Sequence, residues 1–211
     1  MGLFGKAKKD IQTVSSASCP HCKAILDPIP QRKKKCPSCG KDIYVRTNPF
    51  KGEKILVNYA DALSIDAIST LGITEKEHRA ESEELAHKFK MATPFLSDIV
   101  WGIIGRRQLD SFKRKDWQQA KMLYWEQARL LHQLGKDFFR VLQESAKCEL
   151  YHYQAMGIDK AEILTAGETS CIKCQSLNGK IFSVTEALEA MPIPVRDCEN
   201  GFCRCLYLPK T

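Results

Sequence analysis

Four cysteines near the N-terminus have the spacing of a closed zinc site. They form two Cys-Pro-x-Cys pairs, Cys19 with Cys22 and Cys36 with Cys39, separated by thirteen residues. A two-residue spacing lets both sulfurs of a pair reach one ion at about 2.3 Å, and a second pair completes a tetrahedron. We therefore predict a structural zinc ion bound by these four thiolates, with no coordination position left open. His21, inside the first pair, is either a spare ligand or a solvent-facing residue.

A second group of cysteines lies near the C-terminus. Cys171 and Cys174 form another Cys-x-x-Cys pair, and three more cysteines follow after a gap: Cys198, Cys203 and Cys205. We predict a second zinc ion here, so that the chain binds two. Cysteines at alternate positions of an extended segment point to opposite faces, so only one of Cys203 and Cys205 is expected to bind, with a slight preference for Cys203.

A dithiol redox pair at Cys171 and Cys174 is the competing interpretation. A thiolate of low pKa usually needs a helix N-terminus or adjacent positive charge, and only Lys173 is close in sequence. The tenth cysteine, Cys148, is expected to be a packing residue. The sequence has no H-E-x-x-H motif, P-loop, dinucleotide fingerprint or nucleophile elbow, so we predict that the protein is not an enzyme.

The elements around the first cysteine set indicate a zinc ribbon over residues 19–54, preceded by a flexible basic lead-in at 1–18. Gly40 follows the second pair at a point where the backbone must reverse, which favours a residue that tolerates positive φ. Residues 43–45 are β-branched or aromatic and predict a strand. The segment 47–52 is rich in turn formers and is interpreted as a linker.

Residues 55–160 carry helical patterns. Thr74 and Glu77 form a capping box that opens a helix ending near Met91, and a further helix is expected from Pro94. Between Asp116 and Gly157 the apolar residues recur about every 3.6 positions. They predict one helix of about 38 residues and roughly 57 Å, unless Gly135 kinks or splits it. A helix of that length presents its face to other helices or to another subunit, so an oligomer is a possibility that the pattern leaves open.

The last module, residues 161–211, alternates short strands and turns. We predict a strand at 162–165, a hairpin at Asn178-Gly179, a short helix capped by Ser183 and Glu186, and a closing strand at 206–208. The predicted fold class is therefore mainly α, with a helical middle domain between an N-terminal zinc ribbon and a small C-terminal α+β zinc-binding module.

The positive charge of the chain is concentrated at its N-terminal end. The formal net charge is +7, and residues 1–54 contain twelve Lys or Arg against four Asp or Glu. Four consecutive basic residues lie between the cysteine pairs: Arg32, Lys33, Lys34 and Lys35. They are either a solvated loop or a set of phosphate contacts for DNA. No apolar run approaches the roughly 18 residues of a membrane span, and no secretory signal is present, so a cytoplasmic location without membrane attachment is expected.

The C-terminal part, roughly residues 120–209, resembles the end of phage head-morphogenesis proteins, the minor head proteins of the Mu F-like group. The shared pattern is a Cys-x-x-Cys pair, a Gly-Lys-x-Phe turn and a Cys-Arg-Cys, carried by Cys171, Cys174, Asn178, Gly179, Lys180, Phe182, Cys203, Arg204 and Cys205. Family members often have a histidine shortly before the Cys-Arg-Cys, where this chain has Cys198.

That resemblance implies a non-enzymatic component of phage heads, associated with portal or capsid proteins or with DNA. We therefore interpret the chain as a zinc-binding assembly protein of phage or prophage origin, present in the host cytoplasm and able to enter a virion. The helical middle would dock on a protein partner, and the ribbon would contact DNA. The alternative from another class is a nucleic-acid-binding regulator in which the zinc ribbon carries the function.

Overall fold

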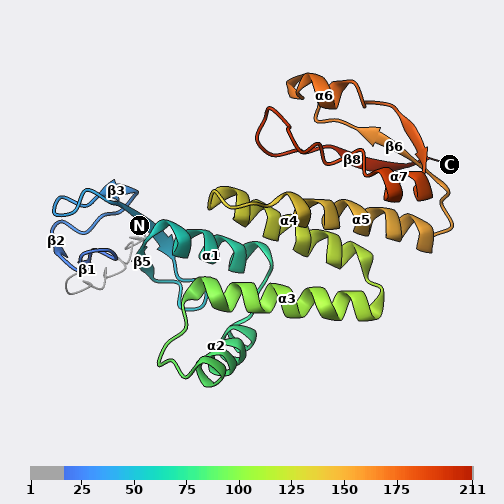
Figure 1. Cartoon of the computed structure of the whole chain (residues 1–211). Helices are drawn as coiled ribbons and strands as arrows, with labels where there is room; N and C mark the ends of the chain where they lie inside the picture. The colour runs from blue at the N-terminus through green and yellow to red at the C-terminus, as the bar shows by residue number, and fades with distance from the viewer. Residues whose placement is uncertain (1–16, 211) are drawn as a thin grey trace, which may run out of the picture. The chain divides into compact units, whose positions relative to one another are not determined.

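The computed structural model of the chain describes residues 17–210 (Figure 1). The chain folds as two compact units that divide between Asp66 and Ala67, and each unit is considered by itself. The predicted lead-in lies outside the described residues except for Ala17 and Ser18, which form strand β1. None of the described helices is long and apolar enough to cross a membrane.

The first unit is built from short antiparallel strands. Strand β1 (Ala17–Ser18) pairs with β2 (Ile25–Leu26), and a second sheet has the order β3 (Lys34–Lys35), β4 (Asp42–Thr47), β5 (Lys54–Val57). The predicted strand at 43–45 is thus confirmed as part of β4. The segment 47–52, interpreted from the sequence as a linker, is instead the last residue of β4 and most of the turn that connects β4 to β5, and the Asn48 side chain accepts hydrogen bonds from the backbone N–H groups of Phe50 and Lys51.

The buried apolar cluster around the ribbon cysteines is very small. It consists of Leu26 and Ile43 together with the buried cysteines Cys19 and Cys36. After β5, the Asn58 side chain accepts from the backbone N–H of Asp61 and opens helix α1 (Tyr59–Thr70). A cluster with only two large aliphatic side chains cannot by itself offset the conformational entropy lost on ordering some forty residues. The ribbon therefore needs a second source of stability, and its thiol groups can supply one by binding a metal ion.

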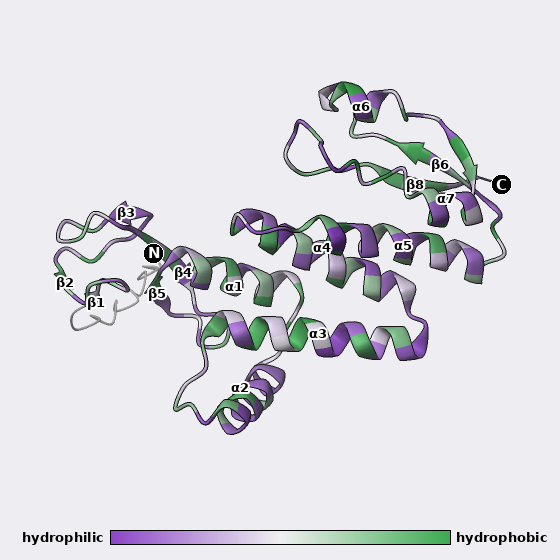
Figure 2. Cartoon of the chain, in the orientation of Figure 1, coloured by the Kyte–Doolittle hydropathy of each residue, from purple (hydrophilic) through white to green (hydrophobic). Residues whose placement is uncertain are grey.

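The second unit contains a helical bundle. Helix α2 (Glu75–Phe89) has the predicted capping box, in which Thr74 accepts from the N–H of Glu77 and the Glu77 carboxylate accepts from the N–H of Thr74. Helix α3 (Leu96–Arg114) follows, and hydrophobic and hydrophilic residues alternate along it (Figure 2). Its inward side is aliphatic and buried, formed by Ile99, Val100, Ile103 and Ile104.

The predicted long helix is divided in two. Helix α4 (Trp117–Gln133) ends before Gly135, which has a φ of +67°, and helix α5 (Phe139–Ala155) begins after the turn. The side chain of Ser145 donates to the carbonyl of Lys121, so the start of α4 lies beside the middle of α5 and the two helices are antiparallel. The stated alternative, in which Gly135 splits the long helix, is therefore confirmed and no single 57 Å helix forms, because a glycine with positive φ reverses the chain at its midpoint.

The C-terminal part packs a three-stranded sheet on α5. The strand order is β7 (Ile181–Ser183), β6 (Lys160–Leu164), β8 (Leu206–Lys210), all antiparallel, with helix α7 (Val184–Ala190) after β7. Helix α7 has the predicted Ser183–Glu186 capping box. The buried residues of this core come from α5, the sheet, α7 and the loop before Cys198: Leu150, Tyr153, Ala161, Ile163, Val184, Ala187, Ile193 and Tyr207.

The predicted Asn-Gly hairpin is wrong in its strand pairing. Residues 181–183 pair with β6, which lies before the cysteine pair, and the segment before Asn178 is helical rather than extended. Asn178 instead binds the end of β6, where its side-chain oxygen accepts from the N–H and the hydroxyl of Thr165. With that exception the fold class is as predicted: a helical middle, an N-terminal cysteine-bearing ribbon and a C-terminal α+β module.

Candidate metal centres

Each Cys-Pro-x-Cys pair of the ribbon is held in a tight turn of the same form. The N–H of Lys23 donates to the carbonyl of Cys19 at 3.0 Å, and the N–H of Gly40 donates to the carbonyl of Cys36 at 2.9 Å. Lys23 and Gly40 both have positive φ, 63° and 70°. Gly40 was expected at such a position. Lys23 was not, because its residue type gives no indication of a left-handed backbone.

The four ribbon thiols converge on one point. The Sγ atoms of Cys19 and Cys39 are 3.9 Å apart, those of Cys22 and Cys36 are 3.7 Å apart, and all four lie within 4.8 Å of one another. A zinc ion bound by four thiolates at about 2.3 Å requires an edge of about 3.8 Å between sulfurs. The donor set therefore fits tetrahedral zinc in both chemistry and spacing, and the sulfur pairs at 3.7 Å and 3.9 Å are well beyond the about 2.05 Å of a disulfide bond.

The ribbon backbone is arranged to stabilise thiolate charge. The N–H of His21 lies 3.4 Å from the sulfur of Cys19. Burial raises the pKa of Cys36, but the backbone N–H groups of Cys39 and Ser38, together with the neighbouring thiols of Cys19 and Cys39, outweigh burial and lower that pKa to about 6. Thiolates are the form that binds zinc, so these donors favour metal binding. His21 itself is exposed, and its Nε2 lies 2.9 Å from the carbonyl oxygen of Asp42 rather than at the sulfur cluster.

The C-terminal cysteines are brought together from two segments. Cys171 precedes the one-turn helix α6 (Ile172–Gln175), which contains Cys174, and a short 3-10 helix (Gly167–Thr169) leads into it. The other three cysteines lie on the loop between α7 and β8. The side chain of Asn200 on this loop donates to the carbonyl of Thr169 at 2.8 Å, which ties the two segments together.

The five C-terminal thiols form two triangles that share Cys174. One triangle contains Cys171, Cys174 and Cys198, and the other contains Cys174, Cys203 and Cys205. The sulfur of Cys174 is 3.9 Å from that of Cys198 and 3.9 Å from that of Cys203. Contrary to the sequence-based expectation, Cys203 and Cys205 do not point to opposite faces, because residues 203–205 are outside the strand and both sulfurs lie within reach of Cys174.

Backbone donors support thiolate charge at one residue of this cluster, Cys171, whereas burial raises the pKa of Cys174 and of Cys198. The N–H groups of Cys174 and Glu199 lower the pKa of Cys171. The thiol of Cys205 donates to Cys203 and lowers the pKa of Cys203. A redox pair at Cys171 and Cys174 would need an accessible nucleophile. The two residues are only 4% and 2% exposed, and Cys174 is surrounded by further thiols, so the geometry suits a metal ion better than thiol exchange.

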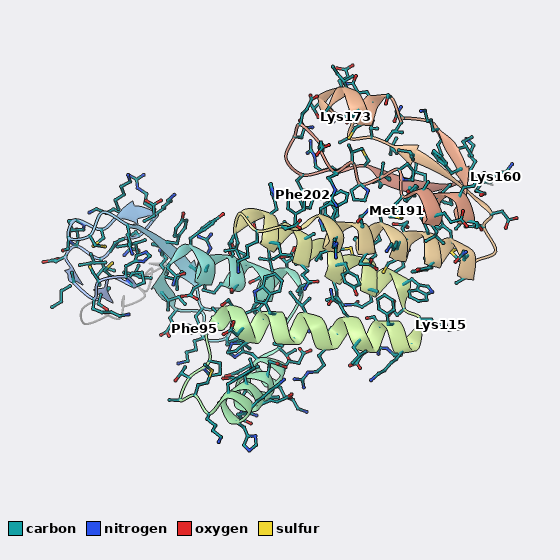
Figure 3. The ribbon with its side chains drawn as sticks, viewed as in Figure 1. Phe95, Lys115, Lys160, Lys173, Met191 and Phe202 are labelled. Atoms are coloured by element: carbon teal, nitrogen blue, oxygen red, sulfur yellow. The ribbon has the colours of Figure 1, made fainter. Side chains whose placement is uncertain are left out.

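The hairpin formed by helices α4 and α5 packs against the C-terminal cysteine cluster. Ala128 of α4 and Leu142 of α5 are in the same buried cluster as Cys171, Cys174 and Cys203. Aromatic rings surround this contact: Trp125, His132, Phe138 and Phe202, with the ring of Phe202 5.1 Å from those of Trp125 and Phe138. Phe202, on the cysteine loop, lies where that loop meets α4 (Figure 3). The sequence patterns did not identify this role for Phe202, since a single aromatic residue between cysteines has no periodic context.

The predicted phosphate-contacting residues occupy two sides of the ribbon sheet. All four, Arg32, Lys33, Lys34 and Lys35, are exposed. Lys35 pairs across the sheet with Asp42, and Lys34 pairs with the buried Ile43, so the two lysines are on opposite faces. Lys33 forms an ion pair with Asp42 at 2.9 Å. The remaining cysteine, Cys148, is fully buried on α5, and burial raises the pKa of its thiol to about 12, as suits a packing residue.

Comparison with protein-family models, curated proteins and solved structures finds no match for this chain. What is established is therefore structural: two cysteine clusters with the geometry of metal sites, one on a ribbon of short strands and one on an α+β module that packs against a helical hairpin.

Proposed function

We propose that the chain is a non-enzymatic zinc-binding structural protein of the phage head-morphogenesis type, which docks on a protein partner and contacts DNA through its ribbon. The observation that carries the first part is the convergence of nine cysteines from distant segments into two sulfur clusters. Two zinc ions per chain are expected, one in each cluster.

The thiol clusters favour a structural role over a catalytic one. Catalytic zinc has three protein ligands and a position for water or substrate, whereas structural zinc is enclosed by four. The ribbon offers four thiols within 4.8 Å of one another, and the C-terminal cluster offers five thiols in two triangles that share Cys174. A surplus of thiolate ligands leaves no position for a substrate, which supports our interpretation that the protein is not an enzyme.

The head-morphogenesis assignment is supported by how the shared motif folds. The residues of that motif belong to one module: Cys171 and Cys174 supply thiols to the metal site, Asn178 anchors the following turn on the end of β6, and Phe182 packs on the core of the sheet. The cysteine at 198, in the region where relatives of that group have a histidine, lies 3.8 Å from Cys171 and can replace that ligand.

Two measurements test the proposal. Elemental analysis of the purified protein should give about two zinc ions per chain; one ion or none would overturn the double-site interpretation. Mass spectrometry of phage particles from cells that carry the gene within an induced prophage should find the protein in heads or head precursors. Its absence from both, together with a function that requires DNA binding, would favour the alternative of a zinc-ribbon regulator.

A further inference from the structure

The face of the ribbon sheet opposite its small core, together with the start of helix α1, carries a cluster of aromatic and cationic side chains, which we call the aromatic-basic face: Lys33, Lys35, Tyr44 and Arg46 from the sheet side and Tyr59 from α1. Residues alternate along a strand. In β4, Ile43 points into the small core, so Tyr44 and Arg46 point away from it. Lys35 lies across the sheet from Asp42 and therefore shares this face.

The two tyrosines are in contact, and two cations lie beside Tyr44. The rings of Tyr44 and Tyr59 have centroids 5.3 Å apart and planes inclined by 36°. The ammonium of Lys33 lies 4.8 Å from the centroid of the Tyr44 ring, and the guanidinium of Arg46 lies 5.9 Å from it. Tyr59 is the more accessible ring, with 41% of its surface exposed. The exposed ring of Tyr59 is thus available next to Tyr44 and to the two cations that lie beside Tyr44.

Acidic residues fix the cations in place without neutralising the face. Asp42 binds Lys33, and Asp66 accepts two hydrogen bonds from Arg46, at 2.8 Å and 3.0 Å. Lys33 keeps 55% of its side chain exposed and Arg46 keeps 32%. Lys35 adds a further charge on this face, so three cations stand against two carboxylates. Cations held in this way contact a phosphate with less loss of side-chain entropy than free ones.

We propose that the aromatic-basic face binds single-stranded nucleic acid, with a base stacked on Tyr59 and the neighbouring phosphates near Lys33, Lys35 and Arg46. A single strand combines an unpaired base, which can stack on an aromatic ring, with a backbone that follows positive charge. In a duplex the faces of the bases are stacked and inaccessible, and proteins usually recognise its sequence by inserting an α-helix or a two-stranded β-ribbon into a groove. This inference refines the DNA contact of the proposed function and depends on the ribbon being folded around its metal.

The stacking contact is tested with full-length, zinc-loaded protein and an oligothymidylate of about twelve nucleotides, within the usual range of site sizes. Fluorescence anisotropy should show tighter binding of the single strand than of a duplex of equal length. Tyr59→Ala should weaken single-strand binding about 5- to 150-fold, the range that one base–aromatic stack contributes. Tyr59→Phe should retain binding because it keeps the ring. Zinc content and circular dichroism show whether each variant is folded.

The charge contribution is tested with a matched pair of neighbouring lysines. Lys35→Ala and Lys34→Ala remove the same charge from the same strand, but only Lys35 lies on the aromatic-basic face. Lys35→Ala should weaken single-strand binding and reduce the slope of log affinity against log salt by about 0.7, the value for one phosphate contact on a single strand. Lys34→Ala should change the slope of log affinity against log salt less than Lys35→Ala does.

The possible failures are distinguishable. If single and double strands bind equally and Tyr59→Ala changes nothing, the inference is overturned while a DNA contact of the ribbon survives. If the two lysine variants have equal effects, the binding surface is not confined to this face and the inference also fails. If neither nucleic acid binds to zinc-loaded protein, the DNA contact of the proposed function is lost together with this refinement.

Discussion

Removing Cys203 and Cys205, singly and together, tests how the C-terminal cluster holds its metal. Cys171, Cys174 and Cys198 form one triangle of thiols, and tetrahedral zinc needs a fourth ligand. Both Cys203 and Cys205 lie within 4.8 Å of Cys174, so either can supply it. We expect each single Cys→Ser variant to retain about two zinc ions per chain and the double variant to retain about one.

The expected magnitude follows from the number of thiolates left. Structural zinc in small peptides is bound with an apparent free energy of about 10–16 kcal/mol, or roughly 2.5–4 kcal/mol for each of four ligands. Loss of Cys203 alone leaves four thiols within the cluster, so the affinity should fall by less than about tenfold, or 1.4 kcal/mol. Loss of both leaves three thiols and should weaken binding by about a hundredfold or more.

Competition with a chromogenic zinc chelator measures this affinity, and elemental analysis measures the number of ions. Cys198→Ser provides the comparison, because it removes a member of the other triangle while leaving Cys203 and Cys205 in place. If Cys203→Ser alone releases the ion and Cys205→Ser does not, Cys203 is the fourth ligand and Cys205 cannot replace it. That result would refute the inference that either cysteine can complete the site. If neither the single variants nor the double variant changes the zinc content, the metal is not bound here.

Three further predictions concern positions at which the structure gives a specific physical cause. Gly40→Ala should destabilise the ribbon by about 1–2 kcal/mol, the cost of a left-handed backbone at a residue with a Cβ, measured as a lower thermal midpoint of the zinc-loaded protein. Partial burial raises the pKa of Glu77, but Thr74 and the guanidinium of Arg107 outweigh burial and lower it. The ionised Glu77 therefore stabilises the folded protein fully above the unfolded pKa of about 4.3, and this stabilisation is lost as the pH falls through the lower folded pKa. Arg107→Gln should therefore lower urea stability at pH 7 by about 1 kcal/mol or less, because Glu77 is partly exposed, and an equal difference below the folded pKa would contradict this. Gly102→Ala should destabilise α3 by about 1–3 kcal/mol because its Cβ would overlap a buried carboxylate of α2, whereas Gly105→Ala, with open space around it, should be neutral or stabilising in denaturant titrations.

Local features of the fold were predictable from the sequence because their causes lie within a few residues. The capping boxes at Thr74 and Ser183 each satisfy two backbone N–H groups through a side chain three positions away. The turn at Gly40 needs only a residue that accepts positive φ. The two-residue spacing of Cys19 and Cys22 likewise places two sulfurs near one ion without help from distant parts of the chain.

Features that depend on distant partners could not be predicted in this way. The strand after Asn178 pairs with β6 rather than with the residues immediately before it, since the intervening segment is occupied by the α6 turn that positions Cys174. The side of the loop on which Cys205 lies depends on the irregular backbone before β8, where strand alternation does not apply. Phe202 packs between aromatic rings of α4 and the start of α5, which are some seventy residues away in sequence.

The two cysteine clusters differ in how far the fold around them depends on metal. The ribbon has an apolar interior of Leu26 and Ile43 plus two cysteines, so metal ligation supplies most of what holds it together. The sheet β6–β8 instead packs its own apolar residues against α5, including Ile163 and Tyr207, and burying each such side chain contributes about 1.5–3 kcal/mol.

Chelation should therefore affect the two ends of the chain unequally. In the apo protein, tryptic cleavage at Arg32 and the lysines after it should become fast, while the strands of the β6–β8 sheet stay protected and only the loop that carries Cys198 opens. Limited proteolysis followed by mass spectrometry, with zinc restored as the control, measures both ends in one experiment. Equal loss of protection at both ends would show that the C-terminal sheet also requires its metal, and that its packing on α5 contributes less than these buried side chains indicate. Unchanged protection at both ends would show that neither the ribbon nor the C-terminal sheet needs a metal ion to stay folded.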